Sequence, residues 1–176
     1  MNAIAPRTGR RAATALGFTL MELLVVVVIV GILSAAAMPS MRSLVLGQRI
    51  KTAVADVHAS IVYARSEAIK RGQTVAMCAK NADGSGCGNT INWAVGWIVF
   101  VDADGNGFPG AVADILKKQD ALTGVTLTGT GTNLSYTRDG RLAATVADFR
   151  ASNTGVPAAR CVRVNVSGQP NTKAGC

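Results

Sequence analysis

An uninterrupted apolar run near the N-terminus constrains this chain more than any other feature. Between residues 18 and 38 the polar side chains are Thr19, Glu22 and Ser34. A helix of this length extends about 31 Å, enough to cross the hydrocarbon core of a bilayer. The segment before it contains three arginines and no acidic residue. We therefore expect residues 18–39 to form a membrane-spanning helix, with residues 1–17 in the cytoplasm and the rest outside.

An ordinary secretory signal is the alternative interpretation of this N-terminus. The small residues 34–37 imitate a cleavage site of that kind, but the apolar core of a secretory signal is shorter.

Glu22 is the unusual residue of the apolar run. A carboxylate within the membrane-spanning part of a helix costs roughly 2.5–3.5 kcal/mol on insertion scales. No Lys or Arg lies within one helical turn of Glu22. Either its partner comes from another molecule, or the side chain reaches the headgroup region, where the cost is small.

The motif Gly17-Phe18-Thr19-Leu20-Met21-Glu22, followed by the apolar run, resembles the class III signal of type IV prepilins and pseudopilins. The resemblance implies that a prepilin peptidase removes residues 1–17 by cutting between Gly17 and Phe18, and that the new Phe18 terminus is N-methylated. It also implies that Glu22 pairs with the terminal amine of a neighbouring subunit during assembly. Pro39 lies where similar pilins have a helix-kinking proline.

A second helix is expected over residues 40–72. Its apolar side chains are spaced three and four residues apart, which places them on one helical face. They are Leu46, Ile50, Val54, Val57, Ile61, Ala64 and Ala68. Basic residues end the segment, and Gly72 is the expected stop. We expect one continuous helix of more than fifty residues, bent at Pro39.

Residues 73–176 show a period of two and many turn residues, which is typical of strands. The expected strands are Thr74–Ala79, Trp93–Val101, Asp114–Gln119, Val125–Thr128, Leu134–Thr137, Leu142–Phe149 and Cys161–Val166. Short strands after a single N-terminal helical region predict an α+β fold with a mostly antiparallel sheet in the globular head.

Three segments of the stalk and head resemble the GspH/FimT family of minor pilins and minor pseudopilins. They are Tyr63–Val75, Gly96–Asp102 and Arg138–Arg141. The resemblance implies a pilin-like fold and a minor pilin that primes or caps a type IV pilus. Its partners would be other pilins, the prepilin peptidase and the inner membrane, with the head in the periplasm before assembly and in a pilus or pseudopilus afterwards. A minor pseudopilin of type II secretion is one alternative.

Four cysteines in an exported head predict disulfides, because the periplasm is oxidising. We favour Cys78–Cys87 and Cys161–Cys176, because each pair brackets a turn-rich segment. Zinc ligands need closer spacing than either pair provides.

Asp102, Asp104 and Asn106 begin a segment like a calcium loop, with oxygen-bearing side chains at alternate positions and a glycine after Asn106. The position that normally supplies a bidentate carboxylate is Ala113. An ordinary turn accounts for the same pattern. We therefore expect no metal here.

No nucleophile, metalloprotease or phosphate-loop motif occurs, and the one histidine, His58, lies on the predicted stalk helix. A solvated or half-buried histidine is favoured over a metal ligand there. We expect no enzymatic activity and no cofactor.

DNA binding during natural transformation is the other alternative function. The candidate residues are Arg138, Arg141, Arg160, Arg163 and Lys173; the wider basic set also contains Lys117, Lys118 and Arg150. Such side chains neutralise phosphates without reading bases. The FimT branch uses a C-terminal Gly-Arg-x-Arg motif, whereas residues 168–171 here read Gly-Gln-Pro-Asn. A solvated rim of mixed charges is the competing interpretation.

Overall fold

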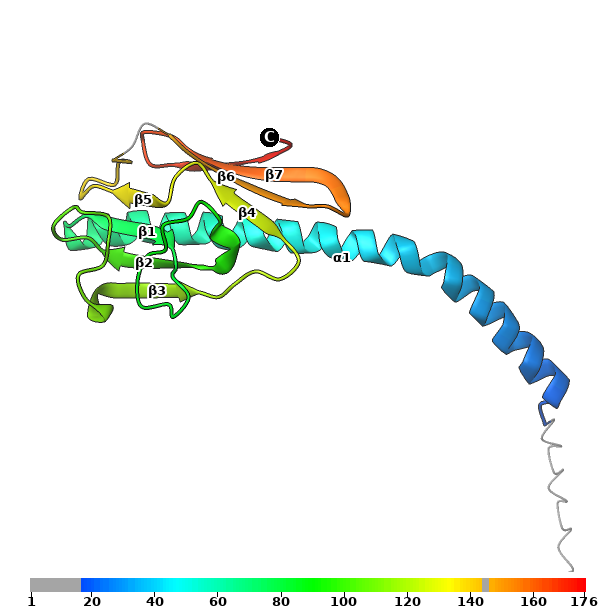
Figure 1. The fold of residues 1–176 in the computed structure, drawn as a ribbon. Coiled ribbons are helices and arrows are strands. Elements are labelled where there is room, and N and C mark those ends of the chain that lie inside the picture. The colour runs from blue at the N-terminus through cyan, green and yellow to red at the C-terminus, as the bar shows by residue number, and fades with distance from the viewer. Residues whose placement is uncertain (1–16, 144–145) are drawn as a thin grey trace, which may run out of the picture. The chain divides into compact units, whose positions relative to one another are not determined.

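A computed structural model describes residues 17–143 and 146–176, without the side chains of residues 36–40 and 158. The expected leader, apart from Gly17, lies outside the described residues. The chain forms two compact units, Met1–Pro39 and Ser40–Cys176. Helix α1 comprises 52 residues, Leu20–Arg71, so the expected long helix is confirmed (Figure 1). The expected bend at Pro39 stays a prediction.

The apolar run predicts a membrane-spanning helix over residues 18–39. Within the part of the chain that the structure describes, no helix is both long enough and apolar enough to cross a membrane.

The C-terminus of α1 has the geometry that its sequence predicts. Gly72 adopts a left-handed conformation with φ of 63°. The Gln73 N–H donates to the carbonyl oxygen of Ala68 at 3.3 Å, which satisfies one of the last helical carbonyls. Lys70 and Arg71 lie in the last turn, where the helix dipole favours positive charge.

The head contains two four-stranded sheets in which every pairing is antiparallel. The first has the order β3-β2-β1-β5, and the second has the order β4-β6-β7-β8. The strands are β1 (Val75–Ala79), β2 (Trp97–Val101), β3 (Ile115–Gln119), β4 (Thr126–Gly129), β5 (Asn133–Tyr136), β6 (Ala147–Asn153), β7 (Val156–Val164) and β8 (Pro170–Ala174). The α+β class with antiparallel pairing is confirmed.

Two strand predictions began several residues too early, and the strand expected from Cys161 begins at Val156 instead. Trp93–Val95 forms a 3-10 helix, because the Asn92 side chain accepts the Ala94 N–H and caps a turn there. The strand expected over 142–149 begins at Ala147, and Leu142 contributes only an isolated bridge.

Strand β8 was not expected from the sequence. Its residues are mostly exposed, and it pairs with β7 alone. An exposed edge strand of this kind has no alternation of apolar and polar residues, so the periodicity of the sequence does not predict it.

A single apolar cluster joins α1 to both sheets. The predicted helical stripe lies in it: Ile50, Val54, Val57, Ile61, Ala64 and Ala68 are buried. Leu46 is half-buried at the start of the stripe. In Figure 1 this part of α1, in cyan, runs alongside the strands of the head. The amphipathic face is therefore covered by sheet, as its pattern predicts.

The opposite face of the first sheet has a small core of its own. Ala76, Cys78, Ile98 and Phe100 are buried there, with Cys87 packed against them. The structure joins Cys78 to Cys87 and Cys161 to Cys176, each with a Cα–Cα distance of 5.6 Å, which is the pairing favoured from the sequence. The first bond holds the loop after β1 against this face.

Two glycines form a junction between α1, β5 and the β7–β8 turn. The Tyr136 hydroxyl donates to the Gly168 carbonyl at 3.0 Å, and Arg65 Nε donates to the Gly140 carbonyl at 2.9 Å. Gly168 has φ of 80°, and a Cβ added to it would collide with the carbonyl oxygen of Gly140. Gly140 belongs to the Arg138–Arg141 motif, so this motif has a structural role at the junction.

We predict that Gly168→Ala destabilises the head more than Gly175→Ala does. Both glycines have nearly the same φ, 80° and 77°, but no atom lies within 4 Å of a Cβ added to Gly175. The backbone strain, roughly 1–2 kcal/mol, is common to both variants. The collision adds about 1–3 kcal/mol for Gly168→Ala alone. Urea unfolding of the full chain in detergent, with disulfides intact, measures the difference; equal losses would contradict the packing of this junction.

Candidate functional site

The start of α1 is organised by Thr19. The Thr19 carbonyl accepts the N–H groups of Glu22 and Leu23 at 3.1 and 3.2 Å, and its hydroxyl accepts the Glu22 N–H at 3.3 Å. Thr followed three residues later by Glu is the capping-box pattern. The Glu22 side chain is exposed in the first turn, where the helix dipole favours a negative charge. The helix therefore begins at the expected processing site, two residues after Phe18.

The described apolar side chains between residues 18 and 35 are all exposed. Leu20 is 82% exposed, Val25 is 45% exposed, and the Phe18 ring that precedes the helix is 75% exposed. A continuous apolar surface of this kind is much larger than the patches of typical soluble monomers. Glu22 forms no ion pair with any of the described residues. This surface needs lipid or other protein chains to cover it.

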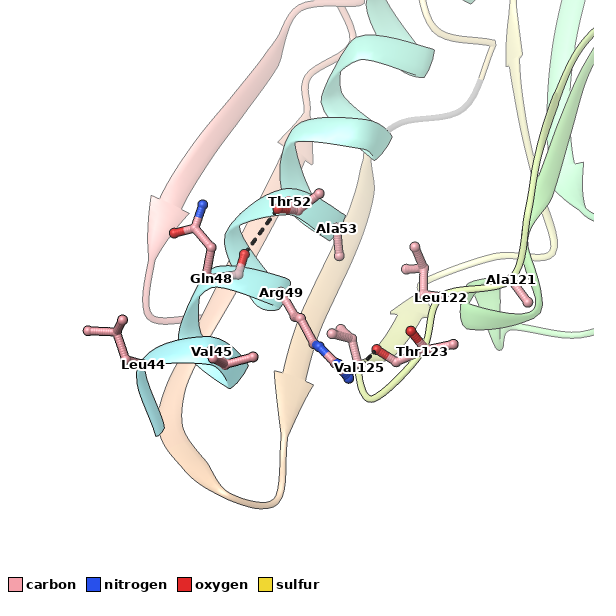
Figure 2. A pocket seen from close by; sticks show the side chains of 10 residues that line it. All are labelled: Leu44, Val45, Gln48, Arg49, Thr52, Ala53, Ala121, Leu122, Thr123 and Val125. Atoms are coloured by element: carbon pink, nitrogen blue, oxygen red, sulfur yellow. Dashed lines mark hydrogen bonds between the residues drawn. The ribbon is translucent and has the colours of Figure 1, made fainter. Parts of the chain in front are cut away.

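A second open apolar surface lies in the Ser40–Cys176 unit. It is a groove of about 450 Å³ between α1 and residues 121–125. Figure 2 shows Arg49 extending from α1 toward Thr123, whose carbonyl accepts from Arg49 Nη1 at 3.4 Å. Leu44 and Val45 line one side and are 69% and 48% exposed. Apolar side chains make up most of the lining, and the polar lining residues are Gln48, Arg49, Thr52 and Thr123.

The structure brings together only two of the five candidate DNA-binding residues. Arg163 and Lys173 line a cavity of about 400 Å³ beside the Cys161–Cys176 disulfide. Arg150, from the wider basic set, lines the same cavity. It lies opposite Cys161 across β6 and β7, and Lys173 lies opposite Cys161 across β7 and β8. We call Arg150, Arg163 and Lys173 the cationic cluster.

Asp148 neutralises part of this cluster. Its carboxylate accepts from Arg163 Nε at 2.7 Å and from Nη2 at 3.1 Å, a bidentate pair. This hydrogen bonding and the negative charge raise the pKa of Arg163. Arg150 and Lys173 are the members of the cluster that remain available to an anion.

The other three candidate DNA-binding residues lie outside this cavity. Arg160 lines a separate small cavity with Lys51 and His58 on α1. Arg138 and Arg141 flank the turn between β5 and β6, and both are exposed. Arg160 lies away from the cationic cluster, because side chains alternate between the two faces of β7 and Arg160 points to the opposite face from Cys161 and Arg163. Side chains alternate between the two faces of β6 (Asp148, Phe149, Arg150). This alternation was the sequence signal by which Arg150 could have been included among the predicted DNA-binding residues.

The loop after β2 contains the three residues of the calcium-like pattern. Asp102 is 2% exposed, and its Oδ2 accepts the Gly107 N–H at 3.1 Å. Asp104 Oδ1 accepts the Asn106 N–H at 3.4 Å, and Asn106 Oδ1 accepts the Phe108 N–H at 2.7 Å. Among the described residues, no group of three or more His, Cys, Asp or Glu side chains is placed to hold a metal ion.

Comparison with known protein families finds two matches, one in the head and stalk and one at the N-terminus. Residues 53–168 match the family described as type II transport protein GspH, and residues 14–38 match the prokaryotic N-terminal methylation motif. No curated protein sequence matches the chain.

Two crystal structures of the Pseudomonas aeruginosa type IV minor pilin FimU share the fold. One has a TM-score of 0.57 at 21% identity and covers 72% of this chain and 92% of FimU. The other has a TM-score of 0.56 at 23% identity and covers 70% of this chain and 95% of FimU. Proteins of these families are structural subunits and not enzymes. The GspH match spans more than half of the sequence, and the methylation motif precedes it, so the chain belongs to the GspH family of type IV pilin-like proteins.

Proposed function

We propose that this protein is a minor pilin that primes or caps a type IV pilus. The observation that carries the proposal is the exposed apolar start of α1, with Glu22 in its first turn and no ion-pair partner among the described residues. Before assembly, residues 18–39 anchor the protein in the inner membrane, and the head lies in the periplasm. After assembly, the same apolar surface is covered by the helices of neighbouring subunits.

The negative charge of Glu22 supports its proposed role in filament assembly. Once residues 1–17 are removed, the terminal amine of Phe18 in one subunit is the cation that a neighbouring Glu22 pairs with. A carboxylate buried among apolar helices needs such a partner, because an uncompensated charge there is costly. A subunit therefore packs into the filament only when residues 1–17 have been removed and residue 22 carries a carboxylate.

The minor role rests on the likeness to FimU, which is a type IV minor pilin. A subunit present in few copies acts where few are needed, at the beginning or the end of a filament. A minor pseudopilin of type II secretion would use the same residues, and the description of the matching family favours this alternative. Detection of the chain in sheared pili supports the pilus role, whereas loss of protein secretion in its absence supports the alternative.

We predict that Glu22→Gln leaves the amount of protein unchanged but excludes it from filaments. Gln fits this position of the capping-box pattern as Glu does, and the Thr19 hydroxyl still accepts the N–H of residue 22, so α1 begins normally while the negative charge is lost. A lost charge-assisted contact of about 1.5–3 kcal/mol corresponds to roughly a tenfold to hundredfold fall in incorporation. Immunoblots of sheared filaments and of membranes measure the ratio.

Thr19→Ala is the matched control for this experiment. It removes the cap hydroxyl that accepts the Glu22 N–H, at a cost of about 1 kcal/mol to the helix, and keeps the carboxylate. We expect nearly normal incorporation. Normal incorporation of Glu22→Gln, or an equal loss in Thr19→Ala, would contradict the role of the charge.

We predict that the mature protein begins with N-methylated Phe18. Intact-mass spectrometry of membrane-extracted protein should show the loss of residues 1–17 and the addition of one methyl group. A strain without prepilin peptidase is the control and should keep the full chain. Retention of Met1 in the normal strain would contradict the proposal.

DNA capture is a second candidate function, and the cationic cluster is the observation that favours it. The cavity opens beside Arg150 and Lys173, whose charges carry no ion pair with a described residue. Such a surface contacts phosphates without reading sequence. The pairing of Arg163 with Asp148 limits the number of phosphates that it can neutralise.

We predict that any binding of duplex DNA by the full chain in detergent depends on this cluster. The double variant Arg150→Ala/Lys173→Ala should abolish binding or reduce its salt slope by about two, since each lost phosphate contact contributes about 0.9. Arg138→Ala/Arg141→Ala removes the same charge from another place and should change binding little. Absence of binding at low salt, or equal loss in both variants, would refute DNA capture by the cluster.

A further inference from the structure

We propose that the loop after β2 is a calcium site in which Asp102, Asp104 and Asn106 supply side-chain oxygens. The sequence argued against a metal here, because Ala113 stands where a bidentate carboxylate is usual. The structure adds an observation that the sequence could not contain, and it concerns Asp102.

Asp102 is a buried carboxylate that is only half satisfied. Its side chain is 2% exposed, and Oδ2 accepts the Gly107 N–H, but Oδ1 is buried without a hydrogen-bond partner among the described residues. Buried charged groups in native proteins are normally paired or coordinate a metal ion, because desolvating an unpaired charge is costly. No Lys or Arg forms an ion pair with Asp102 in the described part of the chain. A cation is therefore the missing partner.

Asp104 adds a second negative charge beside the first. Asp104 follows Asp102 by two residues in the same turn, and its carboxylate accepts the Asn106 N–H at 3.4 Å on Oδ1 and the Asn106 side-chain amide at 2.6 Å on Oδ2. Two neighbouring carboxylates repel each other unless a proton or a cation lies between them. A divalent ion satisfies both at neutral pH.

The third side chain and the backbone complete an oxygen-rich loop. Asn106 Oδ1 accepts only the Phe108 N–H, so it keeps a second lone pair for an ion. Gly105 and Gly107 have φ of 71° and 80°, which allow the chain to turn tightly around a centre. Carboxylate and amide oxygens are ligands of Ca²⁺, and loop carbonyls and water supply the remainder of its six to eight oxygens.

The composition of the loop indicates a weak calcium site. Only two carboxylates contribute charge, and Ala113 provides none. Dissociation constants of about 10⁻⁴–10⁻³ M are typical of extracellular calcium modules with few charges. The Asp102 N–H also donates to the Thr74 carbonyl at 2.9 Å, next to the first residue of β1. A bound ion would fix the loop between β2 and β3 to the start of the first sheet.

Calcium-dependent stability of the full chain in detergent tests the proposal. After removal of calcium with EGTA, CaCl₂ at about ten times the dissociation constant should raise Tm by roughly 3–6 °C. Isothermal titration calorimetry should give about one ion per chain. MgCl₂ at the same concentration should produce a smaller shift, because Mg²⁺ dehydrates reluctantly and prefers an octahedral site.

Asp104→Ala should abolish the calcium shift and leave the fold intact, because this side chain is exposed. Asp83→Ala is the matched control: Asp83 is exposed, and its Oδ1 accepts the Ser85 N–H at 2.9 Å in a similar turn, but it has no buried carboxylate beside it. Asp102→Asn should also lose the shift, and its Tm in EGTA should equal or exceed that of the normal chain. No shift with calcium, an undiminished shift in Asp104→Ala, or an equal shift with magnesium would overturn the proposal.

Discussion

One face of α1 holds the head together, because both sheets bury their inner sides against it. Ala64 and Ala68 are fully buried on this face, and their small side chains allow the strands to approach the helix closely. Ser60 is also fully buried there, and Lys117 Nζ of β3 lies 3.2 Å from its hydroxyl. Each large apolar side chain that the face buries contributes about 1.5–3 kcal/mol. The remaining surface of the same helix stays free for other contacts.

The outer face of the first sheet lacks such a helix and is stabilised in another way. Its core consists of Ala76, Cys78, Ile98 and Phe100, which is too little apolar surface to fix a loop by burial alone. The Cys78–Cys87 bond closes a loop with a sequence separation of nine, which contributes roughly 2.5 kcal/mol in the chain-entropy model. The disulfide therefore holds the loop on this face, where few apolar side chains are packed. This arrangement is stable only in an oxidising compartment.

The sequence predicted the parts of the fold whose signals are local and periodic. The stripe from Ile50 to Ala68 was identified correctly because burial on a helix repeats every three or four residues. β8 was missed because an exposed edge strand is defined by its pairing with β7, and pairing leaves no trace in its polar composition. The same limit applies to the basic residues. Alternation alone separates Arg160 from Arg163 on β7, but the placement of Arg150 and Lys173 opposite Cys161 depends on strand register, which is set by contacts between distant segments.

Groups that the fold leaves unsatisfied point to partners that the chain needs. Among the described residues, two buried side-chain atoms lack hydrogen bonds, Trp97 Nε1 and Asp102 Oδ1. The indole N–H is neutral, so its unmet hydrogen bond costs on the order of 1–3 kcal/mol, which a stable core tolerates. A carboxylate oxygen belongs to a charged group, and its desolvation costs more. The difference in charge is why Asp102 implies a cation whereas Trp97 implies no ligand, and why a ligand of the head is to be sought at the loop after β2.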